Sequence, residues 1–178
     1  MHTNNQINMR DLAMLAGASS CSIIRAAHGE KTLNSVDTVV SSTLDAALAD
    51  APATQEDTVI YTRVPYDYVL QALRCCNNGH VYITRAPVFA TMDAAKFEKE
   101  WFSIANYKFT NTDVAILVPA GTKILHMNDY CKSFGDAAVV LNSGLPLLFL
   151  GCERKKKLSK KKTYTFLIRV VESYADDQ

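Results

Sequence analysis

The chain has 178 residues, of which 48% are hydrophobic and 21% charged, as is typical of a globular protein with its own core. We expect one domain over residues 1–178, because this length leaves little room for two. The net charge of +1 shows no bias toward a nucleic-acid partner, and the five cysteines and four histidines lack the spacing of a disulfide framework or a zinc site.

Residues 1–57 are expected to form a helical N-terminal part. The sequence predicts a short helix at 9–16 that ends at Gly17 and the small residues after it. A second helix is predicted to begin with Ser35 as its N-cap and to end before Pro52. There is no signal-peptide pattern and no window of about 18 apolar residues. We therefore expect a cytoplasmic protein without membrane contact.

Residues 58–172 are expected to form a strand-rich core, followed by a frayed tail at 173–178. Residues 58–64 predict a strand that Pro65 stops, and Pro65 also suits the first position of a helix. A further helix is predicted at 94–105. The other predicted strands are 80–84, a short piece at 89–92, 114–118, 122–127, 137–141, 147–150 and 163–171. This order of elements indicates an α+β fold with antiparallel or mixed sheets.

The sequence contains no P-loop, GxGxxG, GxSxG or HExxH motif. Five short blocks nevertheless follow one another at plausible separations. They are IYTRVP at 60–65, VFATMD at 88–93, VAILVPAG at 114–121, DAAVVLNSG at 136–144 and KTYTFLIRVV at 162–171. In this order they resemble the mono-ADP-ribosyltransferases of the arginine–serine–glutamate class, especially those that bacteriophages use on host proteins.

The resemblance implies an ADP-ribosyltransferase-like fold, with N-terminal helices followed by two packed antiparallel or mixed sheets around a cleft. It also implies NAD as co-substrate and a host protein as acceptor, with arginine as one candidate acceptor residue, in the host cytoplasm if a phage encodes the chain. Arg63 would hold the pyrophosphate of NAD, with Arg85 as an alternative cation. Thr91 would orient the ribose. Tyr61 and Phe89 would line the cleft or stack on nicotinamide.

Three departures from the family's motifs concern catalysis. Thr62 stands where the arginine is expected, and a shift of one residue along a strand reverses the face. Ala90 and Met92 replace two serines. Asp136 stands for the upstream acid that positions the acceptor, while Ala138 occupies the position of the catalytic glutamate. Because alanine offers neither charge nor hydrogen bond, the chain is either an inactivated variant or a natural pseudoenzyme.

Two further segments offer interaction surfaces. The loop at 128–135 carries Tyr130 and Phe134; in the resembling family the corresponding loop selects the acceptor protein, and an ordinary turn is the alternative. The basic segment consists of Arg154, Lys155, Lys156, Lys157, Lys160, Lys161 and Lys162. It is either a solvated hairpin tip or a contact with nucleic acid or an acidic protein. The alternative function is therefore a non-catalytic binding module on the same fold.

Overall fold

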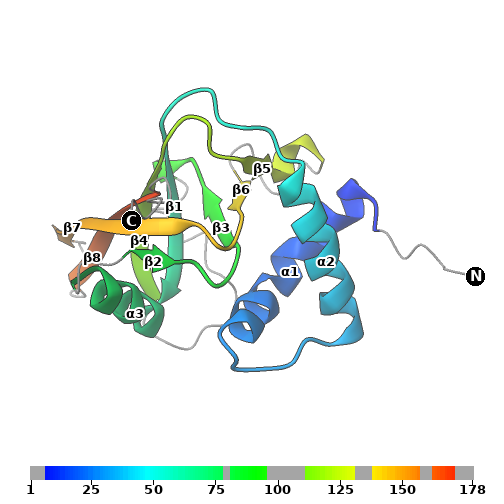
Figure 1. The fold of residues 1–178 in the computed structure, drawn as a ribbon, viewed down its shortest axis with the longest axis horizontal. Helices are drawn as coiled ribbons and strands as arrows, with labels where there is room; N and C mark the ends of the chain where they lie inside the picture. The colour runs from blue at the N-terminus through cyan, green and yellow to red at the C-terminus, as the bar shows by residue number, and fades with distance from the viewer. Residues whose placement is uncertain (1–6, 78–80, 96–110, 131–137, 157–161, 171–178) are drawn as a thin grey trace, which may run out of the picture.

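The computed structural model describes residues 7–77, 81–95, 111–130, 138–156 and 162–170. Two N-terminal helices form a layer beside one end of a mixed β-sheet, and a third helix packs against the strands toward the other end (Figure 1). The helices are α1 (Met9–Ala27), α2 (Ser35–Ala49) and α3 (Tyr66–Asn77). The strands are β1 (Thr58–Pro65), β2 (Tyr82–Ile83), β3 (Val88–Thr91), β4 (Asn111–Val118), β5 (Ile124–His126), β6 (Ala138–Leu141), β7 (Pro146–Lys156) and β8 (Lys162–Val170), with a 3-10 turn, η1 (Met127–Asp129), after β5. No helix in the described ranges combines the length and the apolar character that a membrane span requires.

Helix α1 is longer than the sequence predicts, because it continues through Gly17. The predicted end at Gly17 is therefore wrong. A glycine inside a helix costs roughly 1 kcal/mol relative to alanine, but the second half of α1 buries residues such as Ile23, each of which contributes about 1.5–3 kcal/mol. Ser19, also buried, donates from Oγ to Oδ1 of Asp37 in α2 at 2.7 Å. Packing against α2 thus outweighs the local stop signal.

Two predicted boundaries shift by one residue. Asn34, rather than Ser35, caps α2, and its side-chain oxygen accepts a hydrogen bond from the backbone N–H of Asp37 at 2.7 Å. Asparagine is as good an N-cap as serine. Pro65 ends β1 opposite Asn111, and α3 begins only at the next residue. A proline is tolerated there because the end of a strand does not depend on its missing donor.

Most other predicted strands recur in the structure with altered ends. The strands at 58–64 and 114–118 are confirmed within β1 and β4, whereas 147–150 is only the first part of β7. The apolar pattern ends at residue 150, but the backbone of β7 remains paired with β8 as far as Lys156. The predicted helix at 94–105, apart from 94–95, and the predicted tail lie outside the described residues.

The eight strands of the described residues follow the order β2-β7-β8-β4-β1-β3-β6-β5, in which β4 and β8 are parallel and the other neighbours antiparallel. Between β1 and β3 the register consists of one residue pair, Tyr61 with Thr91. Next to it, Oγ1 of Thr62 donates to the backbone oxygen of Phe89 at 2.7 Å. We call this contact the β1–β3 junction. It joins a five-strand part, which ends at β1, to a three-strand part that begins at β3.

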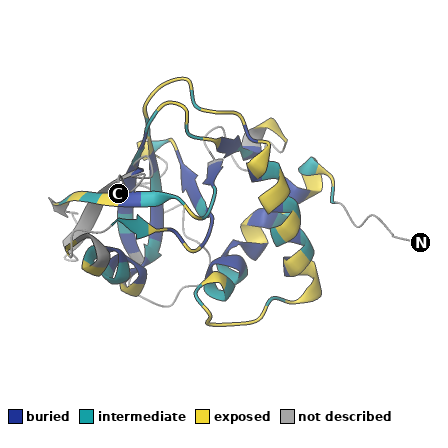
Figure 2. Cartoon of the chain, viewed as in Figure 1, coloured by how far each residue is buried: buried dark blue, intermediate teal, exposed yellow. Residues whose placement is uncertain are grey.

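The core consists of two clusters, visible as buried strands and helix faces in Figure 2. The first lies between α1, α2 and the three-strand part, and includes Leu44, Phe89 and Val140. The second lies on the other face of the sheet and includes Ala90 and Val139. Because neighbouring residues of β3 and β6 point to opposite faces, the three-strand part is buried on both sides. This explains why its sequence is continuously apolar.

Replacing Thr62 with valine should lower the free energy of unfolding by about 1–3 kcal/mol. Thr62 is 1% exposed, and valine has nearly its shape, so the substitution mainly removes the hydrogen bond to the Phe89 carbonyl. Thr58→Val, in the half-buried first position of the same strand, is the matched control and should change stability by less than about 0.5 kcal/mol. Urea unfolding measures both values. Equal effects of the two substitutions would show that the hydroxyl does not hold the junction.

Candidate functional site

A cavity of about 90 Å³ lies between the end of α1, helix α3 and the β1–β3 junction. Its apolar walls include Ile24 from α1, Val64 from β1, Val69 from α3 and Leu147 from β7. The volume is below the roughly 300–1,000 Å³ of a site for a drug-sized ligand. The cavity therefore suits one small ring or chain, rather than a whole large molecule.

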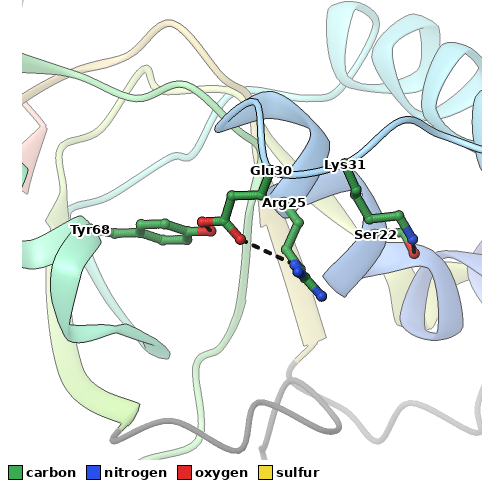
Figure 3. Close-up of polar contacts among 5 residues, drawn as sticks. All are labelled: Ser22, Arg25, Glu30, Lys31 and Tyr68. Atoms are coloured by element: carbon green, nitrogen blue, oxygen red, sulfur yellow. Dashed lines mark hydrogen bonds and ion pairs between the residues drawn. The ribbon is translucent and has the colours of Figure 1, made fainter.

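Tyr68 of α3 lies beside Glu30, which follows α1 (Figure 3), and the end of α1 and helix α3 together form one wall of the cavity. The rings of His28 and Tyr68 stack with centroids 3.7 Å apart and planes within 3°. The Tyr68 hydroxyl donates to Oε1 of Glu30 at 2.7 Å, while Oε2 of Glu30 accepts from Nε of Arg25 at 3.1 Å. Gly29 has φ +76°, which lets the chain turn sharply after the helix. His28, before this turn, therefore contacts the ring of Tyr68, and Glu30, after it, contacts the hydroxyl of the same tyrosine.

His28 carries a polar atom that is directed away from water. Its Nδ1 is buried and has no hydrogen-bond partner among the residues that the structure describes. Burial is the main cause that lowers the pKa of His28, the positive charge of Arg85 lowers it further, and Glu30 opposes both. The imidazole is therefore neutral at pH 7. His28 lines the cavity, and a neutral imidazole can accept one hydrogen bond and donate another.

Arg85 lies at the cavity on the connection from β2 to β3, and it is exposed. The residue before it, Thr84, is fixed by three hydrogen bonds: its N–H donates to Leu145 O at 3.0 Å, its O accepts from Gly144 N at 2.8 Å, and its Oγ1 accepts from Leu145 N at 2.9 Å. Pro87, two residues later, is buried. The backbone that carries Arg85 is thus held in place, although its side chain reaches solvent.

Three residues that the sequence singled out lie in one row across the sheet. Tyr61 of β1 lies opposite Thr91 of β3, and Thr91 lies opposite Ala138 of β6. Thr91 is 1% exposed, and its Oγ1 accepts from the backbone N–H of Asp93 at 3.1 Å. Phe89 is buried and lines the cavity. The structure therefore brings the first, second and fourth sequence blocks together on adjacent strands.

Arg63 is placed differently from the other residues of this set. It lies opposite Asp113 of β4, and its Nε donates to Oδ1 of Asp113 at 2.7 Å. The residue is 8% exposed. Thr62, its neighbour, lines the cavity and Arg63 does not, as the alternation of side chains along a strand requires. The guanidinium that the resemblance assigns to a pyrophosphate is engaged within the sheet.

The predicted interaction segments are described only in part. Tyr130 follows η1 and is 40% exposed, whereas Phe134 and Asp136 lie outside the described residues. The basic segment begins in β7, which contains Arg154, Lys155 and Lys156, and ends at Lys162 in β8. Lys156 pairs with Lys162. Lys157, Lys160 and Lys161 lie outside the described residues.

Sequence reasoning did not find the wall made by His28 and Tyr68. A histidine before a glycine marks the end of a helix, but no local pattern connects it with a tyrosine forty positions later. The expected absence of a metal site stays a prediction, and the described ranges contain no group of three His, Cys, Asp or Glu residues able to hold a metal ion.

Replacing Arg63 with methionine should cost about 3–5 kcal/mol of stability, because it removes this partner from the Asp113 carboxylate, whose side chain is only 12% exposed. Arg25→Met is the matched control. The Arg25–Glu30 pair has side chains 44% and 39% exposed, and surface pairs of this kind contribute at most about 1 kcal/mol. Urea unfolding of the two variants gives the comparison. A loss below about 1 kcal/mol for Arg63→Met would contradict a structural ion pair.

No protein-family model matches this sequence, and no curated protein sequence does. Solved structures do match. Plx2a, an ADP-ribosyltransferase toxin from Paenibacillus larvae, is 10% identical with a TM-score of 0.65, over 92% of this chain and 86% of the toxin chain.

Two other similar structures contain a dinucleotide. Exoenzyme S from Pseudomonas aeruginosa, in complex with human 14-3-3 protein beta and bound to Carba-NAD, is 10% identical with a TM-score of 0.65, over 97% of this chain and 80% of that one. C3stau2 from S. aureus, with NAD, is 14% identical with a TM-score of 0.60, over 92% of this chain and 86% of that one. Identities this low establish the fold alone, and the agreement extends over nearly all of the chain. The chain therefore has the α+β fold of the ADP-ribosyltransferases.

Proposed function

We propose that the chain binds NAD beside the β1–β3 junction and is a mono-ADP-ribosyltransferase scaffold in which Ala138 replaces the catalytic glutamate. The row of Tyr61, Thr91 and Ala138 carries this proposal, because it aligns three motif blocks on adjacent strands. The NAD and Carba-NAD in the structures of C3stau2 and exoenzyme S support the choice of ligand.

The cavity fits one part of NAD. Its walls are apolar, and its volume of about 90 Å³ matches a single ring rather than the dinucleotide. Phe89 lines it, whereas Tyr61 lies half-buried on the face of β1 that Arg63 occupies. The remainder of NAD would extend along the strands toward Thr91 and Ala138. A flat ring buried against an aromatic side chain gains both apolar burial and stacking.

Transfer requires more than binding. The bond between ribose C1′ and the nicotinamide nitrogen breaks, nicotinamide leaves with the electron pair, and the acceptor forms a new bond to C1′ and loses a proton. Positive charge develops on the ribose, and a carboxylate nearby stabilises it. Loss of such an electrostatic group typically costs about 10²–10³ in rate. In our proposal Asp136 positions the acceptor, and Ala138 leaves the ribose charge without its carboxylate.

The acceptor in this proposal is a host protein, modified at arginine as one option. Tyr130 is 40% exposed and, with Phe134, would contact that protein. The phage-type order of the motif blocks supports action on host proteins in the host cytoplasm. The three motif departures together support a natural pseudoenzyme over a chain inactivated at one position.

The Ala138→Glu variant tests the catalytic part. Incubation of each protein with tagged NAD and a bacterial lysate should label a protein band with Ala138→Glu and should label none with the unchanged chain. Asn142→Glu, which adds the same charge just beyond the other end of β6, is the control and should not label. Mass spectrometry of the labelled band identifies the acceptor residue.

Calorimetric titration with NAD separates binding from transfer. Binding by both chains without labelling by Ala138→Glu would remove the transferase proposal and leave a binding module. Absence of NAD binding to either chain would overturn the proposal as a whole.

A second candidate function is binding of a partner through the basic segment without catalysis. The strand pairing favours it, because Lys156 and Lys162 lie directly opposite each other at the end of the β7–β8 pair. The pairing brings two separate parts of the basic segment to one end of the sheet. A polyanionic nucleic acid, or an acidic protein surface, would be attracted to the positive charge of this segment.

The double variant Lys156→Gln/Lys162→Gln should weaken binding to a duplex DNA probe and reduce its salt dependence. Each phosphate contact contributes about 0.9 to the slope of log K against log salt, so the slope should fall by roughly 2. Arg10→Gln/Lys31→Gln removes two charges from exposed positions of the helical part and is the control. Fluorescence anisotropy over a salt series provides the slopes, and identical slopes for both variants would argue against this surface.

A further inference from the structure

Two arginines lie near the β1–β3 junction, in different electrostatic situations. Arg63 is buried and paired with Asp113 at 2.7 Å. Arg85 is exposed and lines the cavity, and the structure shows no ion pair between it and any described carboxylate. The cation at the cavity that is open to an anionic ligand is therefore Arg85.

The backbone that carries Arg85 is held in place beside the cavity. The three hydrogen bonds of Thr84 fix the backbone before it, and the buried Pro87 restricts the backbone after it. A guanidinium on a fixed backbone loses less conformational freedom when it binds an anion. Planar guanidinium groups bind phosphate oxygens bidentately.

His28 supplies a second polar group to the same cavity. Its Nδ1 is buried without a partner among the described residues, and stacking on Tyr68 fixes its ring. The inner walls are apolar, with Ile24 and Val69 among them. A cation and an imidazole beside an apolar cavity match a ligand that joins an anionic group to a flat ring.

We propose that Arg85 and His28 form an anion subsite of the cavity, which binds the pyrophosphate of a nucleotide. The inference rests on the proposed function for the identity of the nucleotide, NAD. It assigns the pyrophosphate to Arg85 in the β2–β3 connection and leaves Arg63 its structural ion pair. One ring of the nucleotide then occupies the apolar cavity.

Charge around His28 makes the subsite sensitive to pH. The groups that act on this ring are Arg85, which lowers its pKa together with burial, and Glu30, which raises it; Tyr68 stacks on it, and Arg25 is paired with Glu30. A bound pyrophosphate offsets the charge of Arg85 and so raises the pKa of His28. Because the ligand prefers protonated His28, affinity rises as the pH falls from the bound-state pKa to the lower free-state pKa.

The test is calorimetric titration of the full chain and its variants with NAD, ADP-ribose and inorganic pyrophosphate. Arg85→Gln should weaken the binding of NAD and ADP-ribose roughly 10- to 100-fold, the range expected for a charge-assisted hydrogen bond. Arg74→Gln, an exposed residue of α3 outside the cavity lining, removes the same charge and should leave affinity unchanged. His28→Asn should abolish the rise in affinity toward mildly acidic pH.

The outcomes separate this inference from the proposed function. Equal NAD affinity of the Arg85→Gln and Arg74→Gln variants would overturn the subsite while NAD binding itself remained. Pyrophosphate binding that depends on Arg85, in a chain that does not bind NAD, would support the subsite and overturn the proposed function. Binding of none of the three ligands would overturn both.

Discussion

The candidate site depends on the short contact between β1 and β3. On one side of it, β1 pairs with β4 along its whole length; on the other, β3 pairs with β6 from Val88 to Thr91. The two parts meet at the single pair of Tyr61 and Thr91, beside the hydrogen bond from Thr62 to Phe89. A slip of one residue would exchange the faces of neighbouring side chains. The hydroxyl of Thr62 thus helps to hold β3 in this register against β1.

This register has an electrostatic consequence for the two arginines. With Thr62 toward the cavity, Arg63 must point to the other face, where it is buried. A buried guanidinium is costly without a partner, and Asp113, directly opposite on β4, provides one. The shifted arginine of the first motif block is therefore explained by packing. Among the described residues that line the cavity, the arginine is Arg85, which the β2–β3 connection contributes.

The sequence predicted the elements better than their contacts. Apolar periodicity and turn residues located β1 and β4, and the order of the motif blocks placed β1, β3 and β6 in a common fold. The prediction of a helix end failed at Gly17, where burial of the second half of α1 outweighs a local helix stop. The stacking of His28 on Tyr68 could not be predicted, because local patterns indicate which face of a helix is buried and not which residue of another helix meets it.

In the proposed function, the absence of a carboxylate at residue 138 affects binding and transfer unequally. Ground-state affinity for NAD would come from the apolar cavity, from stacking and from a cation on the pyrophosphate, and none of these contacts requires a carboxylate at residue 138. The carboxylate acts on charge that develops only as the glycosidic bond breaks, so it contributes to the transition state rather than to the bound ground state. In the proposed function, alanine at residue 138 removes this contribution to transfer and leaves the binding contacts in place. Under the proposed function, a chain with this fold and Ala138 is suited to holding a nucleotide, and the absent carboxylate is one of the three motif departures that bear on transfer.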